Sequence, residues 1–191
     1  MKNLSYFMMI VLAGYLLQGC HSNNSASTTD SAATTIDSSK TAVVPTTADT
    51  SDIKFAKALA AGGAAEITFS KLAESKVEAG KLKNFAAMMI TDHTKAGDTL
   101  TAIAQKENIT LPGGLDPDHQ AKYDDISKMS GTDFNEAYVK LMVADHKGAV
   151  GLLQNESQNG KDSTLKAFAT KILPTVQMHL DAANKLASGM R

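Results

Sequence analysis

The sequence is poor in several features on which common functional sites depend. It contains one cysteine, Cys20, so no disulfide can form within the chain. Tryptophan is absent and aromatic residues make up 5% of the chain, which gives little support to an aromatic platform for sugars or bases. The formal net charge is −1, without long runs of one sign, so the basic surface that nucleic acids require is missing. We therefore expect no nucleic-acid partner.

Residues 1–19 have the character of a bacterial lipoprotein signal peptide. A basic start is followed by an apolar run that is short for a membrane span, and the run ends in Leu17-Gln18-Gly19-Cys20. This ending resembles a lipobox, in which cleavage precedes the cysteine and the cysteine is lipidated; the alternative is an ordinary signal peptide with an incidental cysteine. We expect Cys20 to anchor the protein in the membrane. Since His21 rather than an aspartate follows, we expect an outer-membrane lipoprotein that faces the periplasm.

The rest of the chain divides into a tether and one domain. Residues 20–51 begin with Cys20 and are then mostly Ser, Thr, Ala and Asp, a composition typical of a flexible linker. Residues 52–188 are rich in Ala, Leu, Lys, Met and Glu and lack β-type alternation, which predicts an all-α domain. Glycine- and proline-containing breaks separate the expected helices, with Ser51 or Asp52 as N-cap of the first: 52–79, 82–108, 117–129, 133–158 and 163–188. We predict a four-helix bundle with a short extra helix between the second and third long helices.

Each long helix carries an apolar stripe with one polar interruption. These interruptions are Glu66, His93, His146 and His179. The first two lie at nearly equal distances from the turn at Gly80, and the last two at nearly equal distances from the next turn, so all four are expected in one central layer. The pair Gly62-Gly63 in the first helix is interpreted as a point of close helix packing.

The polar layer has two explanations. A buried carboxylate must find partners or take up a proton, so the layer can be a hydrogen-bonded network that fixes the helix register. Imidazole and carboxylate are also metal ligands, so Glu66, His93, His146 and His179 can instead bind one transition metal ion: zinc, copper or iron.

Two of the three histidines lie in similar segments, FAAMMITDHTK at 85–95 and YVKLMVADHKG at 138–148. Met89 and Met142 precede their histidines by four residues and lie on the same helix face; a thioether suits copper better than iron, although Met is also a common core filler. Asp92 and Asp145 point about 100° away from the neighbouring histidine. They are accessory candidates that either reach across to another helix or remain solvated.

Together these segments resemble a known family. FAAMMITDHTKA and YVKLMVADHKGAV, with Glu66 upstream and Leu173-Pro174 followed by His179, resemble the family of domain of unknown function 4142 over about residues 52–187. That family is described as predicted outer-membrane proteins and is grouped with the ferritin-like superfamily. The resemblance implies a ferritin-like four-helix bundle, and the best-known members of that superfamily hold two metals in the core.

The chain departs from the ligand pattern of di-iron bundles. Those proteins use Glu-x-x-His on two helices, whereas the positions three before the histidines are Ile90, Val143 and Val176. We therefore carry over no di-iron centre from the superfamily. No catalytic constellation is recognisable, and an enzyme with a redox centre built on the same ligands is the third alternative, after the two functions that follow. The function that fits is an envelope lipoprotein that binds a transition metal for metal handling or stress response. The alternative is a non-catalytic structural or interaction lipoprotein whose partner the sequence does not identify.

Overall fold

The computed structural model describes residues 48–190, so the expected signal peptide, Cys20 and most of the expected tether lie outside the described residues. Within this range the chain forms five helices and no strand, which confirms the all-α, ferritin-like bundle with a short helix between the second and third long ones. The helices are α1 (Thr50–Lys76), α2 (Lys81–Lys106), α3 (Pro117–Ser127), α4 (Gly131–Asn159) and α5 (Ser163–Gly189). None of them is long and apolar enough to cross a membrane.

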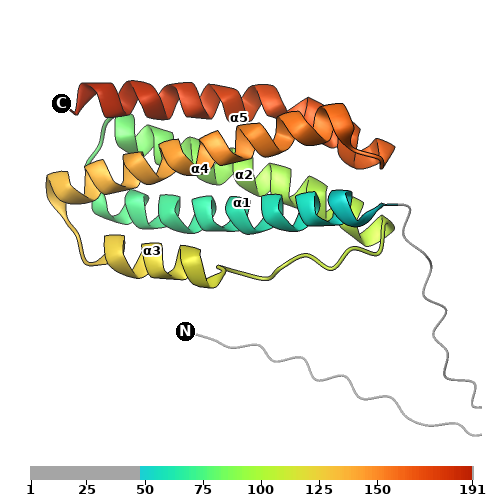
Figure 1. The fold of residues 1–191 in the computed structure, drawn as a ribbon. Coiled ribbons are helices and arrows are strands. Elements are labelled where there is room, and N and C mark those ends of the chain that lie inside the picture. Colours follow the sequence, from blue (N-terminus) through green and yellow to red (C-terminus); the bar gives the residue numbers. More distant parts are fainter. Residues whose placement is uncertain (1–47, 191) are drawn as a thin grey trace, which may run out of the picture. The chain divides into compact units, whose positions relative to one another are not determined.

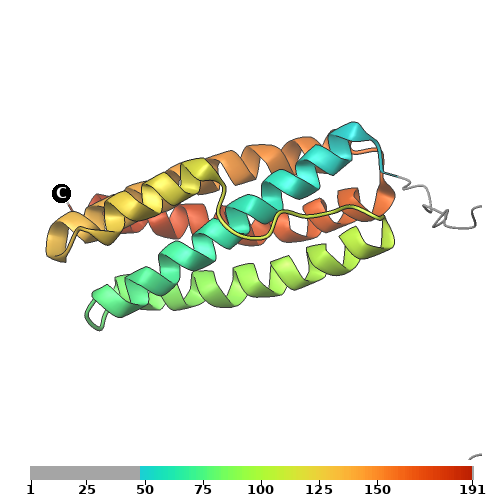
Figure 2. The same ribbon diagram turned by 90° about the horizontal axis from the view of Figure 1, so that it is seen from below.

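The four long helices form two antiparallel hairpins, α1–α2 and α4–α5 (Figure 1). The hairpins pack so that α1 also contacts α4 and α2 also contacts α5. Between them, the segment that ends in α3 returns along the length of the bundle and passes over α1 (Figure 2). As a result α4 runs in the same direction as α2, and every pair of neighbouring long helices is antiparallel.

The turns of both hairpins have specific causes. Gly80 lies between α1 and α2 with φ of 144°, in a region that favours glycine. Asp162 is the N-cap of α5, where its side chain accepts from the backbone N–H groups of Thr164 and Leu165.

The expectation for the start of the first helix was wrong. The N-cap of α1 is Asp49, which accepts from the N–H groups of Ser51 and Asp52. The side chain of Asp52 is fully buried and accepts from the N–H groups of Lys161 and Asp162, at 3.1 and 2.7 Å. The carboxylate of Asp52, which the sequence assigned to a local N-cap, is thus bound by a buried contact with residues far along the chain.

Two apolar clusters fill the two halves of the bundle. One contains Phe55, Leu100, Leu153, Leu165 and Phe168 among its buried residues. The other contains Phe69, Phe85, Met89, Phe134, Tyr138 and Met142. The polar residues of the predicted layer fall between these two clusters along the helices, so the layer interrupts an otherwise apolar interior.

Candidate metal centre

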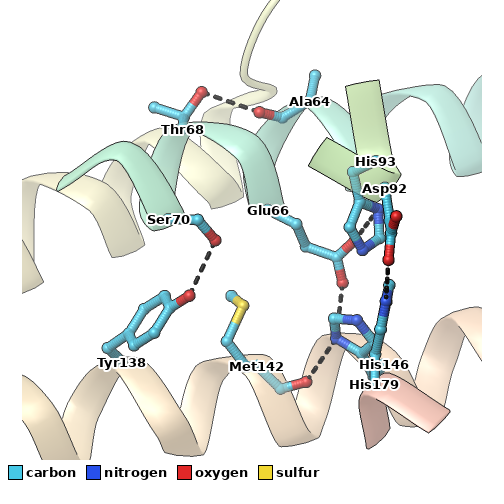
Figure 3. Close-up of polar contacts among 10 residues, drawn as sticks. All are labelled: Ala64, Glu66, Thr68, Ser70, Asp92, His93, Tyr138, Met142, His146 and His179. Atoms are coloured by element: carbon cyan, nitrogen blue, oxygen red, sulfur yellow. Dashed lines mark hydrogen bonds and ion pairs between the residues drawn. The ribbon is translucent and has the colours of Figure 1, made fainter. Parts of the chain in front are cut away.

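One polar side chain from each long helix meets in the middle of the bundle (Figure 3). Glu66 comes from α1, His93 from α2, His146 from α4 and His179 from α5. All four residues are buried, with exposed fractions from 0% for His146 to 9% for His93. The helical register therefore brings together the residues that interrupt the apolar stripes.

Glu66 bridges the rings of two histidines. Its Oε2 lies 3.1 Å from Nδ1 of His93, and its Oε1 lies 3.0 Å from Nδ1 of His146. The single Nδ1–H of His146 is directed at the backbone carbonyl of Met142, 2.9 Å away. Oε1 of Glu66 therefore lies close to Nδ1 of His146 but accepts no hydrogen bond from it. The neighbouring oxygens are acceptors, so we assign the hydrogen of both rings to Nδ1. Nε2 of His93 and of His146 then carries a lone pair.

The third ring is oriented by Asp92. Nε2 of His179 lies 3.0 Å from Oδ2 of Asp92, which is half-buried. By the same reasoning Nε2 carries the hydrogen and Nδ1 of His179 carries the lone pair. Asp92 adjoins His93 in sequence but reaches α5 instead, because adjacent helical residues point about 100° apart.

The three remaining ring nitrogens have no protein partner. His93 Nε2, His146 Nε2 and His179 Nδ1 are buried and make no hydrogen bond within the described residues. One ring nitrogen from each histidine lies within 4.8 Å of the others, and the ring centroids are 5.3, 5.4 and 5.5 Å apart. Each imidazole is thus held by an oxygen at one nitrogen and is free at the other, as ligating histidines are in metalloproteins.

Burial and the neighbouring charges set the protonation of this layer. Burial lowers the pKa of His179 to about 4, although Asp92 acts to raise it, and burial also lowers the pKa of His93. Burial acts to lower the pKa of His146 as well, but Glu66 and a backbone carbonyl outweigh it and raise that pKa. The pKa of Glu66 is lowered, because contacts with His146 and His93 outweigh its burial. The lowered pKa values therefore favour an ionised Glu66 and neutral His93 and His179, whereas the raised pKa of His146 favours its protonated form, so a metal ion would compete with a proton for that ring.

The other accessory candidates have different surroundings. Met89 and Met142 are fully buried in one of the apolar clusters, and at the layer itself Met142 offers its backbone carbonyl. Asp145 does not contact a histidine of the layer. Its Oδ1 lies 3.4 Å from Nζ of Lys122 on α3, while its buried Oδ2 has no protein partner, and burial raises its pKa.

The interpretation of Gly62-Gly63 as a close-packing point was wrong. A Cβ on Gly62 would meet no atom within 4 Å, and a Cβ on Gly63 would make an ordinary contact of 3.9 Å with His93. Together with Gly97 and Gly148, these glycines line a cavity of about 450 Å³ beside the polar layer. A helical glycine either admits a neighbour or leaves space, and the sequence does not distinguish the two.

Sequence reasoning missed the cavity and the Met142 carbonyl. Gly97 and Gly148 were a usable signal for the cavity. Each lies inside a helix within four residues of a layer histidine, where glycine costs about 1 kcal/mol relative to alanine. The carbonyl of Met142 left no signal, because every residue carries one.

The fold is similar to solved structures of low sequence identity. The DUF305 fragment from Deinococcus radiodurans matches with a TM-score of 0.66 and 12% identity, over 74% of this chain and 97% of that chain. CopM in its Cu(II)-bound form matches with a TM-score of 0.63 and 16% identity, over 73% and 97%. CopM in its Ag-bound form matches with 0.59 and 17%, over 72% and 96%. At these identities the likeness concerns the fold alone.

Comparison with curated proteins found no match. The family described as "Domain of unknown function (DUF4142)" matches residues 37–186, which is most of the chain. The protein therefore belongs to the DUF4142 family.

Proposed function

We propose that His93, His146 and His179 bind one transition metal ion and that the protein handles metal at the cell envelope. The observation that supports this most is that three buried histidines bring ring nitrogens within 4.8 Å of one another, while each ring keeps one nitrogen without a protein partner. A network that served only to fix the helices would be expected to satisfy these atoms, because an unpartnered buried polar atom costs about 1–3 kcal/mol. A metal ion would use all three lone pairs at once.

In this proposal Glu66 and Asp92 position the ligands. Each carboxylate lies on the ring nitrogen opposite the lone pair, where it fixes the tautomer and increases the basicity of the ligating nitrogen. This assigns Glu66 a place behind His93 and His146 rather than among the ligands. Metal–nitrogen bonds are about 2.0–2.1 Å, so the rings would have to move somewhat closer than their present spacing.

The donor set favours zinc or copper over iron. Neutral imidazoles suit both metals, and the di-iron ligand pattern is missing from the helices. The likeness to CopM, which has been solved with copper and with silver bound, adds a reason to test copper first. The buried thioethers of Met89 and Met142 lie in the adjoining cluster and would suit a soft ion if the layer rearranged around it.

We also propose that a lipid on Cys20 anchors the protein in the outer membrane and that the domain faces the periplasm. The support is the sequence Leu17-Gln18-Gly19-Cys20 after an apolar run. Labelling with a radioactive or clickable lipid precursor is expected to mark the wild-type chain and not Cys20→Ser. Equal labelling of the two chains would refute the anchor.

Metal stoichiometry tests the proposed binding. The full chain, purified without a polyhistidine tag and stripped with a chelator, is exposed separately to zinc, copper and iron, dialysed, and analysed for metal. We expect about one zinc or copper ion per chain, and loss of that ion in His93→Ala and in His146→Ala.

The matched control is His119→Ala. His119 lies on α3, its Nδ1 is 2.7 Å from Asp116, and it is not part of the histidine triad, so this variant should keep the metal. A wild-type chain that remains helical but binds no metal would favour the alternative function. The layer would then be a hydrogen-bond network in a structural or interaction lipoprotein.

A further inference from the structure

The cavity beside the polar layer exists because small residues occupy inward positions of the bundle. The inward positions next to the polar layer on one side are occupied by Gly62, Ala96 and Ala149. Gly62 precedes Glu66 on α1, Ala96 follows His93 on α2, and Ala149 follows His146 on α4. All three line the cavity and are only half-buried, whereas Phe69 and Leu153 farther along the stripes are fully buried. Bundle interiors are normally filled to crystal-like density, so this level of the bundle is an exception.

The walls of the cavity are mostly apolar. Larger side chains close it on the inner side: Leu100, Leu152, Phe168, Ile172 and Val176. The connecting segment covers part of it through Leu111, Pro112 and His119. A volume of about 450 Å³ is in the range of small-molecule sites, and such sites combine apolar walls with a few polar groups that fix orientation.

Asp145 is the polar group of this cavity that is best placed to recognise a ligand. It contributes to the lining, and its Oδ2, which has no protein partner and is closed to solvent, would accept from a ligand once the side chain turned towards the cavity. Glu66, the other carboxylate of the lining, is already engaged by two histidines. Two carboxylates at the wall disfavour an anion, and Lys122 offsets the charge of Asp145, so a neutral donor fits better than a cation.

We propose that this cavity binds a small, uncharged, mostly apolar molecule that carries one hydrogen-bond donor, and that the donor is bound by Asp145. An apolar cavity of about 150 Å³ accommodates benzene, so the larger volume here has room for a two-ring molecule with a hydroxyl group. The site does not require a metal ion, and the proposal is independent of the proposed metal binding.

The test compares 2-naphthol with naphthalene, which differ by one hydroxyl group. Binding to the full chain in its chelator-treated form is followed by the fluorescence of the ligand, and the chain contributes no tryptophan emission. We expect 2-naphthol to bind at one site, about tenfold or more tighter than naphthalene, because only the hydroxyl can donate to Asp145. In Asp145→Ala this preference should disappear.

Two glycine variants distinguish the cavity from surface binding. A Cβ on Gly62 or on Gly151 would meet no atom within 4 Å, but only Gly62 lines the cavity. Gly62→Leu should weaken 2-naphthol binding about tenfold or more, while the control Gly151→Leu should leave it within about twofold. Gly148→Leu, which adds a side chain at the cavity from α4, guards against a folding defect specific to the first variant.

Three results would overturn the proposal: no binding of 2-naphthol up to its solubility, equal affinity for naphthalene in the wild type, or equal weakening by Gly151→Leu. Because the protein is metal-free throughout, failure here would leave the metal stoichiometry untouched. Conversely, a chain that binds 2-naphthol as expected but no metal would refute the metal proposal alone.

Discussion

At the scale of single residues, the account separates ligands from the groups that orient them. Each of the three histidines keeps one ring nitrogen without a protein partner, and an oxygen near the other nitrogen fixes which one carries the lone pair. The oxygen belongs to Glu66 for His93, to the Met142 carbonyl for His146, and to Asp92 for His179. The role of Asp92 is the easiest to isolate, since its carboxylate is only half-buried and contacts one ring.

Removal of Asp92 should therefore weaken metal binding without unfolding the bundle. We expect Asp92→Ala to lower the affinity for the bound metal by about 10–100-fold, because the His179 ring loses its orientation and some of its basicity. Asp92→Asn retains an acceptor oxygen and should recover part of the loss. Competition against a chelator of known affinity measures the change.

Asp98→Ala is the matched control, an exposed aspartate on the same helix. If it weakened metal binding as much as Asp92→Ala does, general electrostatics rather than ring orientation would explain the effect.

The sequence predicted which residues meet at the site but not what each of them does. Helical periodicity sufficed to place Glu66, His93, His146 and His179 at one level, because height along a hairpin follows from distance to the turn. The tautomer of an imidazole depends on its hydrogen-bond acceptors. Other helices supply them for His93 and His179, and a backbone carbonyl of the same helix supplies it for His146, and the sequence does not indicate these pairings. The assignment of Glu66 behind the rings, and of Asp92 to His179, therefore required coordinates.

At the scale of the elements, helices were predictable and their ends less so. Gly80, the segment around Pro117 and the residues before Ser163 interrupt the helical pattern, so all five helices were expected near their observed ranges. The start of α1 was misjudged because Asp52 is bound by the α4–α5 turn. Such a contact joins residues more than a hundred positions apart, and local capping rules do not contain it.

That contact belongs to an acidic cluster at one end of the bundle. Glu156 near the end of α4 is buried, and its surroundings include the carboxylates of Asp52, Asp49 and Asp162, with Lys161 as the nearby cation. Burial, together with these carboxylates, raises the pKa of Glu156 to about 7. The native protein thus keeps a proton on Glu156 that the unfolded chain has already released.

The sign of the pH dependence follows from this difference. Between the ordinary glutamate pKa of about 4.3 and the native value, the folded state binds the extra proton, so the stability contributed by Glu156 falls as pH rises and is lost above about pH 7. The glutamine of Glu156→Gln cannot ionise. The free energy of unfolding of this variant, minus that of the wild type, should therefore be about 1–2 kcal/mol higher at pH 8 than at pH 5. Urea unfolding at the two pH values measures this gain.

The exposed Glu78 provides the control. Glu78→Gln should show no such difference between the two pH values. A wild-type protein whose stability changed with pH in the same way as that of Glu156→Gln would contradict a proton held at Glu156.

At the scale of the whole molecule, the crossover connection determines how the site is assembled. Each hairpin contributes two of the four polar residues, and the segment that passes over α1 allows the second hairpin to pack with all neighbours antiparallel (Figures 1 and 2). Periodicity left the direction of the second hairpin open, because the polar residues lie near mid-helix and either topology forms a layer. The small residues beside the layer then leave a cavity where a core would otherwise continue.

The most direct test of the central claim is the X-ray absorption spectrum of the metal-loaded full chain. Three histidines as ligands predict a shell of about three nitrogens at about 2.0–2.1 Å, with the outer-shell scattering of imidazole rings. Glu66→Gln should keep this shell at reduced affinity, because Glu66 lies behind the rings. A shell dominated by oxygen, without imidazole scattering, would contradict the account.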